Sequence, residues 1–129
     1  MAKKYQIFEE PQALTSVAAF HDMFNMPVLP TPMIPDERRC QLRVALLQEE
    51  LDELKTAILE NDIVGVADAL SDLQYVLSGA VLEFGLGNKF KQLFDEVQRS
   101  NMSKTCKSLE VAQATQTYYL NEKNTESYI

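Results

Sequence analysis

The chain has no tryptophan, one histidine, two cysteines and four glycines among its 129 residues. Two cysteines are too few for a disulfide scaffold, and Cys40 and Cys106 form no CxxC motif, so we expect reduced thiols. No apolar run approaches the roughly 20 residues that span a bilayer, and the N-terminus lacks the apolar core of a signal peptide. We therefore expect a soluble, cytoplasmic protein without a membrane partner.

Positive charge is also scarce, because 12 lysines and arginines stand against 19 aspartates and glutamates, for a net charge of -7. A field of that sign repels phosphate backbones, so we expect no nucleic-acid partner. A small polyanionic substrate would be repelled as well unless cations bridged it. With 46% hydrophobic residues, the composition is that of a globular protein, and the length predicts a single domain over residues 1–129.

Strand-like alternation is weak throughout, whereas apolar residues recur at helical spacing. The pattern predicts an all-α fold, a bundle of four to five helices at about 13–24, 36–60, 63–84, 89–99 and 109–120. The expected N-caps of the last four helices are Asp36, Asp62, Asn88 and Ser108. We expect the Asn61-Asp62 pair to break the second helix, and Gly85 to take the left-handed conformation after the third.

Four of the five prolines fall between residues 25 and 35, where regular structure is excluded. We expect an ordered, extended loop there that buries its apolar side chains, among them Met33 and Ile34. The second helix carries a narrow apolar seam, formed by Cys40, Val44, Leu47, Leu51, Leu54 and Ile58. Gly79, inside the third helix, costs roughly 1 kcal/mol relative to alanine, which close packing of another group would offset.

Acidic residues flank the apolar stripes of the second and third helices. At 3.6 residues per turn, Glu50 and Glu53 lie one turn apart beside the seam, with Glu49 close to them. On the third helix Asp68 and Asp72 lie one turn apart beside its stripe. If the two helices pack antiparallel through their stripes, up to five carboxylates face one pocket.

Such a cluster repels itself unless hard cations neutralise it. Mg²⁺ prefers oxygen ligands and shares them with water and substrate phosphates, and a carboxylate not used as a ligand can act as a general base. The competing interpretation is a solvated acidic face, because an EExxE pattern alone is common on helices. The second acidic pair, on the next helix, favours the metal site.

Several stretches together resemble the all-α NTP pyrophosphatase superfamily, the MazG and phosphoribosyl-ATP pyrophosphohydrolase-like group. They are Phe20-His21 with the proline-rich loop, residues 47–54 (LQEELDEL), residues 67–76 (ADALSDLQYV) and residues 100–104 (SNMSK). The resemblance covers about residues 17–120 and is closest to the short phage or bacterial branch. It implies an oligomeric MazG-like fold and Mg²⁺-dependent hydrolysis of a nucleoside triphosphate to a monophosphate and pyrophosphate, with Mn²⁺ as a substitute.

The family pattern of EExxE followed by ExxD assigns roles to particular residues here. Glu49, Glu50 and Glu53 match the first half and Asp72 the last position, so the resemblance implies catalysis by the three glutamates. The glutamate of ExxD falls on Ala69, and Asp68 is the expected substitute. The implied metal ligands are Glu50, Glu53, Asp68 and Asp72, and the implied substrate-binding residues are His21, Asn101 and Lys104. A structural histidine, satisfied by a local hydrogen bond, is the alternative for His21.

Three functions stay open at this point. The first is a (d)NTP pyrophosphatase, with a lean towards a purine deoxynucleotide such as dGTP. The second is a phosphoribosyl-ATP pyrophosphohydrolase, and the third is a non-catalytic helical nucleotide-binding or interaction module, which Ala69 keeps under consideration. The resemblance also implies a homodimer or homotetramer, and the host cytoplasm as the location if the gene is phage-encoded.

Overall fold

The computed structural model describes residues 4–104, 113, 114 and 116. In that part of the chain there are four long helices and no strand: α1 (Ala13–Met23), α2 (Glu37–Leu59), α3 (Ile63–Glu83) and α4 (Phe90–Ser103). The predicted all-α fold is thereby confirmed. None of the described helices is long and apolar enough to cross a membrane. Two compact units, Met1–Asn88 and Lys89–Ile129, make up the chain, and whether they act as one domain stays a prediction.

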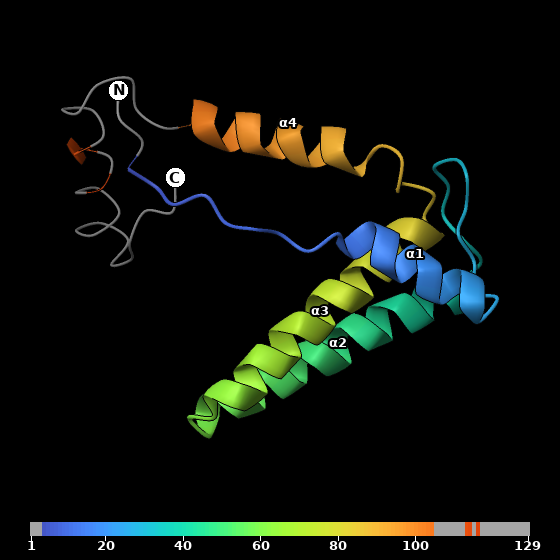
Figure 1. Ribbon diagram of the computed structural model, residues 1–129, viewed down its shortest axis with the longest axis horizontal. Helices are drawn as coiled ribbons and strands as arrows, with labels where there is room; N and C mark the ends of the chain where they lie inside the picture. Colours follow the sequence, from blue (N-terminus) through green and yellow to red (C-terminus); the bar gives the residue numbers. More distant parts are fainter. Residues whose placement is uncertain (1–3, 105–112, 115, 117–129) are drawn as a thin grey trace. The chain divides into compact units, whose positions relative to one another are not determined.

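The first unit is built on a hairpin in which α2 and α3 pack antiparallel (Figure 1). Its turn is short because Asn61 takes a left-handed φ of 55° and Asp62 caps α3, accepting a hydrogen bond from the Gly65 N–H at 3.0 Å. At the other end, Asp36 caps α2 by accepting from the Arg39 N–H at 3.0 Å. Both predicted caps and the predicted break are confirmed, and together they set the register of the hairpin.

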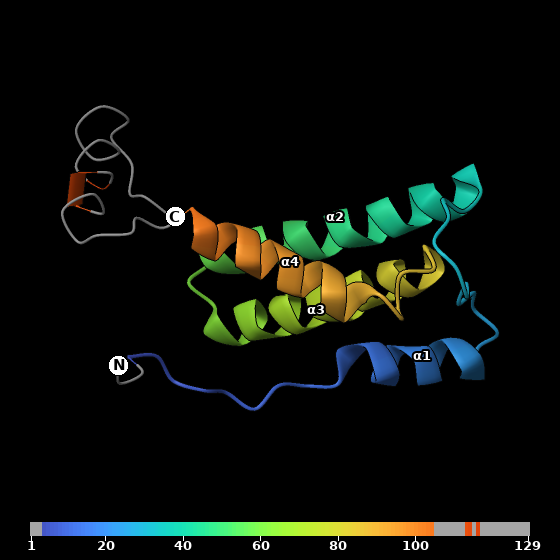
Figure 2. The ribbon, with the colours of Figure 1, turned by 90° about the horizontal axis from the view of Figure 1, so that it is seen from above.

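Helix α1 packs on α3, as its course beside α3 in Figure 2 illustrates. The proline-rich loop that follows is held to the end of α3 by two backbone hydrogen bonds of 3.0 Å, from the Leu29 N–H to the Leu82 carbonyl and from the Met33 N–H to the Phe84 carbonyl. Gly85 has the predicted left-handed conformation, with φ 70°, and a side chain there would overlap the Thr31 carbonyl. The loop is therefore ordered, as predicted.

The expected burial of the loop's apolar side chains is wrong for Met33 and Ile34, whereas Met26 and Leu29 are partly buried. Ile34 is 78% exposed and Met33 is 53% exposed. Backbone hydrogen bonds, rather than apolar packing, attach the loop to α3.

The predicted apolar seam of α2 is only half buried. Cys40, Leu47 and Leu54 are partly covered, whereas Val44, Leu51 and Ile58 are 66%, 49% and 59% exposed. The helix instead turns Arg43 and Ala57 inward, both of them buried. Residues 43, 50 and 57 recur every seven positions and form one row along α2. This row, which includes the charged residues Arg43 and Glu50, faces α3, where the apolar seam was expected.

Helix α4 differs from its prediction at both ends. Lys89, not Asn88, occupies its N-cap position, with no side-chain cap among the described residues. The helix also continues through residues 100–103 to Ser103, beyond its predicted end at about residue 99. No glycine or proline interrupts that stretch, and an ion pair of 2.6 Å between Arg99 and Glu96 supports it. The predicted fifth helix and its cap Ser108 lie outside the described residues, except for residues 113, 114 and 116, which are helical.

Candidate metal and nucleotide site

Three carboxylates from both helices of the hairpin converge on one point. One oxygen each of Glu50 and Glu53, on α2, and of Asp72, on α3, all lie within 4.8 Å of one another. Glu50 and Glu53 are one turn apart, and the antiparallel register set by the Asn61-Asp62 turn brings Asp72 opposite them. The structure therefore joins the two acidic motifs that the sequence places 19 residues apart, between Glu53 and Asp72.

The environment of Glu50 is unfavourable for a bare carboxylate. Its Oε2 is buried and has no hydrogen-bond partner among the described residues. Desolvation, together with the hydrogen bond and charge of Glu53 and the charges of Asp72 and Glu49, raises the pKa of Glu50 to about 7. Repulsion of this kind is relieved by a proton or by a cation. The donor set consists of carboxylate oxygens alone, which suits a hard divalent cation.

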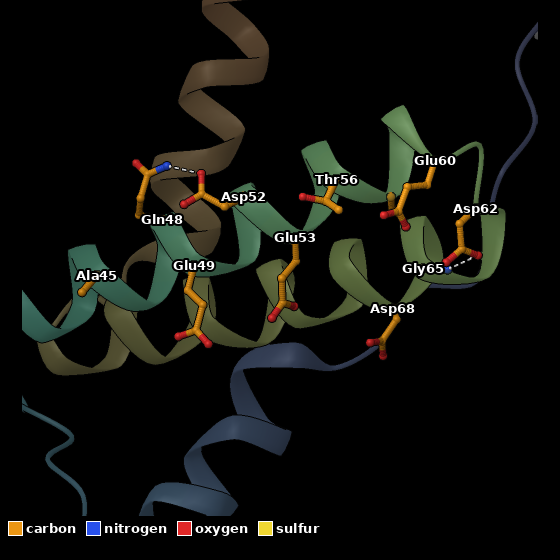
Figure 3. Close-up of a pocket in the computed structure, with 11 residues that line it drawn as sticks. Ala45, Gln48, Glu49, Asp52, Glu53, Thr56, Glu60, Asp62, Gly65 and Asp68 are labelled. Atoms are coloured by element: carbon orange, nitrogen blue, oxygen red, sulfur yellow. Dashed lines mark hydrogen bonds between the residues drawn. The ribbon is translucent and has the colours of Figure 1, made fainter.

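A groove of about 680 Å³ continues from this cluster along the hairpin, and Glu49, Glu53 and Asp68 lie on its wall. In Figure 3 these three carboxylates point to one side of the hairpin, whereas Asp52 points to the other and accepts a hydrogen bond from Gln48 at 2.9 Å. Asp52 and Gln48 nevertheless also line the groove. Asp68 and Glu49 flank the cluster and do not belong to its inner group of three.

A second charged cluster was missed by sequence reasoning. Glu83, fully buried, accepts two hydrogen bonds from Arg39, at 2.7 and 2.8 Å, and pairs with Arg43 at 3.0 Å. Arg43 is 4% exposed and also donates to the Val76 carbonyl at 2.9 Å. Burial lowers the pKa of Arg43, an effect that the charge of Glu83 opposes. The available signal was the position of Arg43, seven residues before Glu50 on the same helix face.

This cluster explains the glycine inside α3. A Cβ on Gly79 would overlap the Arg43 guanidinium and lie 3.2 Å from His21 Nε2. The close approach anticipated from the sequence is therefore made by a buried arginine. Arg43 lies two turns before Glu50 on α2 and connects α2 to α3. The arginine therefore helps to hold the register on which the carboxylate cluster depends.

His21 is 2% exposed, and its Nδ1 donates a hydrogen bond of 2.9 Å to the Pro27 carbonyl. This contact joins α1 to the start of the proline-rich loop, which is the structural role considered for it. The other two predicted substrate-binding residues, Asn101 and Lys104, lie in the second unit, where Lys104 Nζ donates to Asn101 Oδ1 at 3.4 Å. Their predicted contact with phosphates stays a prediction.

Comparison with known proteins agrees with this site. The family model of phosphoribosyl-ATP pyrophosphohydrolase matches residues 17–101, a range that begins within α1 and contains the hairpin and all three clustered carboxylates. No curated protein matches the chain. The matching family lies within the MazG-like all-α NTP pyrophosphatase superfamily and is metal-dependent in general. The chain therefore belongs to the phosphoribosyl-ATP pyrophosphohydrolase family, which indicates a pyrophosphohydrolase, a hydrolase acting on acid anhydrides.

Proposed function

We propose that the protein hydrolyses nucleoside triphosphates, deoxynucleotides included, to a nucleoside monophosphate and pyrophosphate. The observation that carries this proposal is the convergence of Glu50, Glu53 and Asp72 within 4.8 Å. A carboxylate cluster that could bind a cation, beside a groove lined by Glu49, Glu53 and Asp68, suits an anionic substrate that an acidic protein would otherwise repel. It also argues against a module without catalysis, because the buried Oε2 of Glu50 is a cost that packing alone would not require.

The three clustered carboxylates would hold a divalent cation, Mg²⁺ with Mn²⁺ as a substitute. We propose Asp68, on the groove wall, as a further ligand in place of the family glutamate, because Ala69 has no donor atom. In this position the carboxylates would supply the site with a cation whose chemistry would be to offset phosphate charge and to polarise the reacting phosphoryl group. The carboxylates fix its position because both of their helices are locked together by the Arg43–Glu83 pair.

The reaction breaks the bond between the α-phosphorus and the oxygen that bridges it to the β-phosphorus, and a new bond forms to the oxygen of water. Glu49, exposed on the groove wall, accepts the proton of that water at a carboxylate oxygen, as a general base outside the inner cluster. Pyrophosphate leaves with the bridging oxygen. His21 acts by holding the start of the proline-rich loop through its hydrogen bond to the Pro27 carbonyl.

Phosphoribosyl-ATP is the second candidate substrate, and the description of the matching family favours it. Both substrates carry a phosphoanhydride on a nucleoside, so the carboxylate cluster serves either. Selection between the two substrates therefore depends on the surface that contacts the nucleoside. Among deoxynucleotides we favour a purine such as dGTP.

A substrate panel tests the proposal directly. The four dNTPs, the four NTPs and phosphoribosyl-ATP are incubated with Mg²⁺ or Mn²⁺, and the products are identified by ³¹P NMR. We expect pyrophosphate and a monophosphate from at least one triphosphate. Glu53→Gln and Asp72→Asn should reduce turnover to background with unchanged helicity. Glu37→Gln, at an exposed position of α2 outside the groove lining, should keep turnover. Orthophosphate as the sole product, or no turnover with any metal, would refute the proposal.

We also propose that the chain works as a homodimer formed through an uncharged side of the hairpin. Val44, Leu51 and Ile58 recur every seven residues on α2, and these three residues and Leu77, on α3, are all at least 43% exposed. Helix geometry places them on the side of the hairpin opposite Glu53 and Asp68. Apolar strips of this kind on two neighbouring helices commonly mark an interface, and a second copy offers a complementary surface.

Sedimentation of the full chain at micromolar concentration tests this assembly. We expect a dimer or a dimer of dimers, and a shift to monomer in Leu51→Glu combined with Leu77→Glu. Glu37→Gln, at the start of α2 and off the strip, is the control. A stable monomer in the unsubstituted chain would contradict the assembly but leave the chemistry of the site untouched.

A further inference from the structure

A separate cavity of about 410 Å³ lies where the start of α1 crosses α3. Ser16 and Val17 line it from α1, and Leu70, Ser71, Gln74 and Tyr75 line it from α3. Cavities that bind small ligands generally measure from about 300 to 1,000 Å³, with mostly apolar walls and a few polar groups. This one is at the small end of that range, which suits a nucleoside better than a larger organic ligand.

The position of this cavity connects it to the carboxylate cluster. Ser71 precedes Asp72 in the sequence, and Tyr75 follows Asp72 by three residues, so Tyr75 lies about one helical turn beyond it. In Figure 3 the carboxylates of Glu49, Glu53 and Asp68 point to the side of the hairpin on which α1 lies. A ligand whose phosphates lie at Asp72 therefore has its other end directed along α3 towards the cavity.

The polar groups in the wall are only partly used by the protein itself. Gln74 Nε2 donates one hydrogen bond to Ser78 Oγ, at 3.2 Å, which leaves its second N–H and its carbonyl oxygen for a ligand. Ser71 Oγ donates to the Ala67 carbonyl at 2.8 Å and keeps its acceptor capacity. A carboxamide with a free donor and a free acceptor matches the edge of a nucleobase, on which donors and acceptors are adjacent.

An aromatic face completes the wall. Tyr75 is 42% exposed, and its ring contacts Phe20 edge-on, with ring centroids 5.7 Å apart and planes at 87°. Phe20 in turn packs against Phe24, at a centroid distance of 4.6 Å. The edge-on contact holds the Tyr75 ring and leaves a face for stacking, and base–aromatic stacking tolerates any base.

We propose that this cavity binds the nucleoside of the substrate, with Tyr75 stacking against the base and the Gln74 carboxamide reading the base edge. The inference rests on the proposed function, because it assigns the part of the nucleotide that lies beyond the phosphates. It places base selection on α3 and the start of α1, and not on His21, whose side chain is enclosed.

Calorimetry on the full chain with Mg²⁺ separates the two sites by the choice of probe. Inorganic tripolyphosphate carries only the phosphate part, whereas α,β-imido deoxynucleoside triphosphates, which resist cleavage at the α–β position, carry both parts. We expect the preferred imido nucleotide to bind at least about tenfold more tightly than tripolyphosphate, in line with the contribution of one stacked base.

Filling the cavity should remove that difference. Ser16→Phe adds a ring from an exposed position of α1, so we expect nucleotide affinity to fall to the level of tripolyphosphate while tripolyphosphate binding is unchanged. Thr15→Phe adds the same ring at the neighbouring exposed position, outside the cavity lining, and should keep the difference. Equal effects of the two variants, or an unchanged preference in Ser16→Phe, would overturn the proposal.

Base selectivity gives an independent readout. Gln74→Leu retains the shape of the side chain but removes its donor and acceptor, so the ratio of affinities between the best and worst imido nucleotides should fall at least about fivefold. Gln41→Leu, on the exposed side of α2 where Gln41 bonds to Glu37, should leave that ratio unchanged. An unaltered ratio in Gln74→Leu would overturn the assignment of Gln74. Absence of tripolyphosphate binding would instead count against the metal site, and so against the proposed function.

Discussion

Replacement of Arg43 by methionine tests whether the buried charges hold the hairpin in register. Arg43 is 4% exposed, pairs with Glu83 at 3.0 Å and donates to the Val76 carbonyl at 2.9 Å. Arg43→Met keeps the length of the side chain but leaves the fully buried Glu83 with only one of its two cationic partners.

The expected loss of stability follows from the contacts that Glu83 keeps in the variant. Removal of one partner of a buried ion pair typically costs 3–5 kcal/mol. Arg39 still holds both carboxylate oxygens, at 2.7 and 2.8 Å, so the low end of that range applies. We expect the free energy of unfolding to fall by about 3 kcal/mol, with little contribution from the Val76 carbonyl, which keeps its place in the helix.

Urea unfolding followed by far-UV circular dichroism measures this change at a fixed protein concentration, with the m-value as a check that the unfolded surface is unaltered. Arg38→Met is the matched control, because Arg38 is exposed on the same helix and exposed substitutions usually stay within about 0.5 kcal/mol. Adding Glu83→Leu to Arg43→Met should cost less than the sum of the single changes, since the two residues share one interaction. A loss below about 1 kcal/mol in Arg43→Met would refute the reasoning.

Three further predictions concern the same unit. The pKa of Glu50, raised to about 7, favours the protonated folded state, so without divalent cations stability should fall as pH rises from about 4.5 through 7. In Glu50→Gln that fall should be reduced, and Mg²⁺ should restore stability at pH 8; a rise in stability over this interval in the unsubstituted chain would contradict the assignment. Gly79→Ala should destabilise the fold by displacing Arg43, although helix propensity alone predicts a gain of about 1 kcal/mol, and thermal unfolding distinguishes the two signs. Asp36→Ala removes the cap of α2 and should cost about 1 kcal/mol in urea unfolding, whereas no loss would show that the cap contributes nothing.

The elements that the sequence predicted correctly are those decided by neighbouring residues. Helix starts at Asp36 and Asp62 depend on a side chain reaching a backbone N–H three residues later, and the stop at Gly85 depends on a glycine's access to positive φ. Local pattern carries such signals directly. The end of α4 was misplaced because Arg99 and Ser100 are compatible with either a turn or a helix, and the ion pair with Glu96 favours the helix.

The candidate site was predictable in composition but not in arrangement. Glu50, Glu53 and Asp72 could be named from the acidic spacing and from the family resemblance. The inner group of three, with Asp68 and Glu49 beside it, depends on the register between α2 and α3. That register also depends on the ion pair between Arg43 and Glu83, which are 40 residues apart in the sequence.

The sequence by itself determined the first three helices, the caps Asp36 and Asp62, the acidic character of the site and the family, since each depends on residue types at fixed local spacing. Only the tertiary structure decided which row of α2 faces α3, which carboxylates meet, and where a cavity opens beside them. The physical reason is that the face of a helix that becomes buried depends on the sum of all the contacts it makes, and not on its hydrophobicity alone. A buried arginine paired with a buried glutamate can therefore turn a helix away from its most apolar seam.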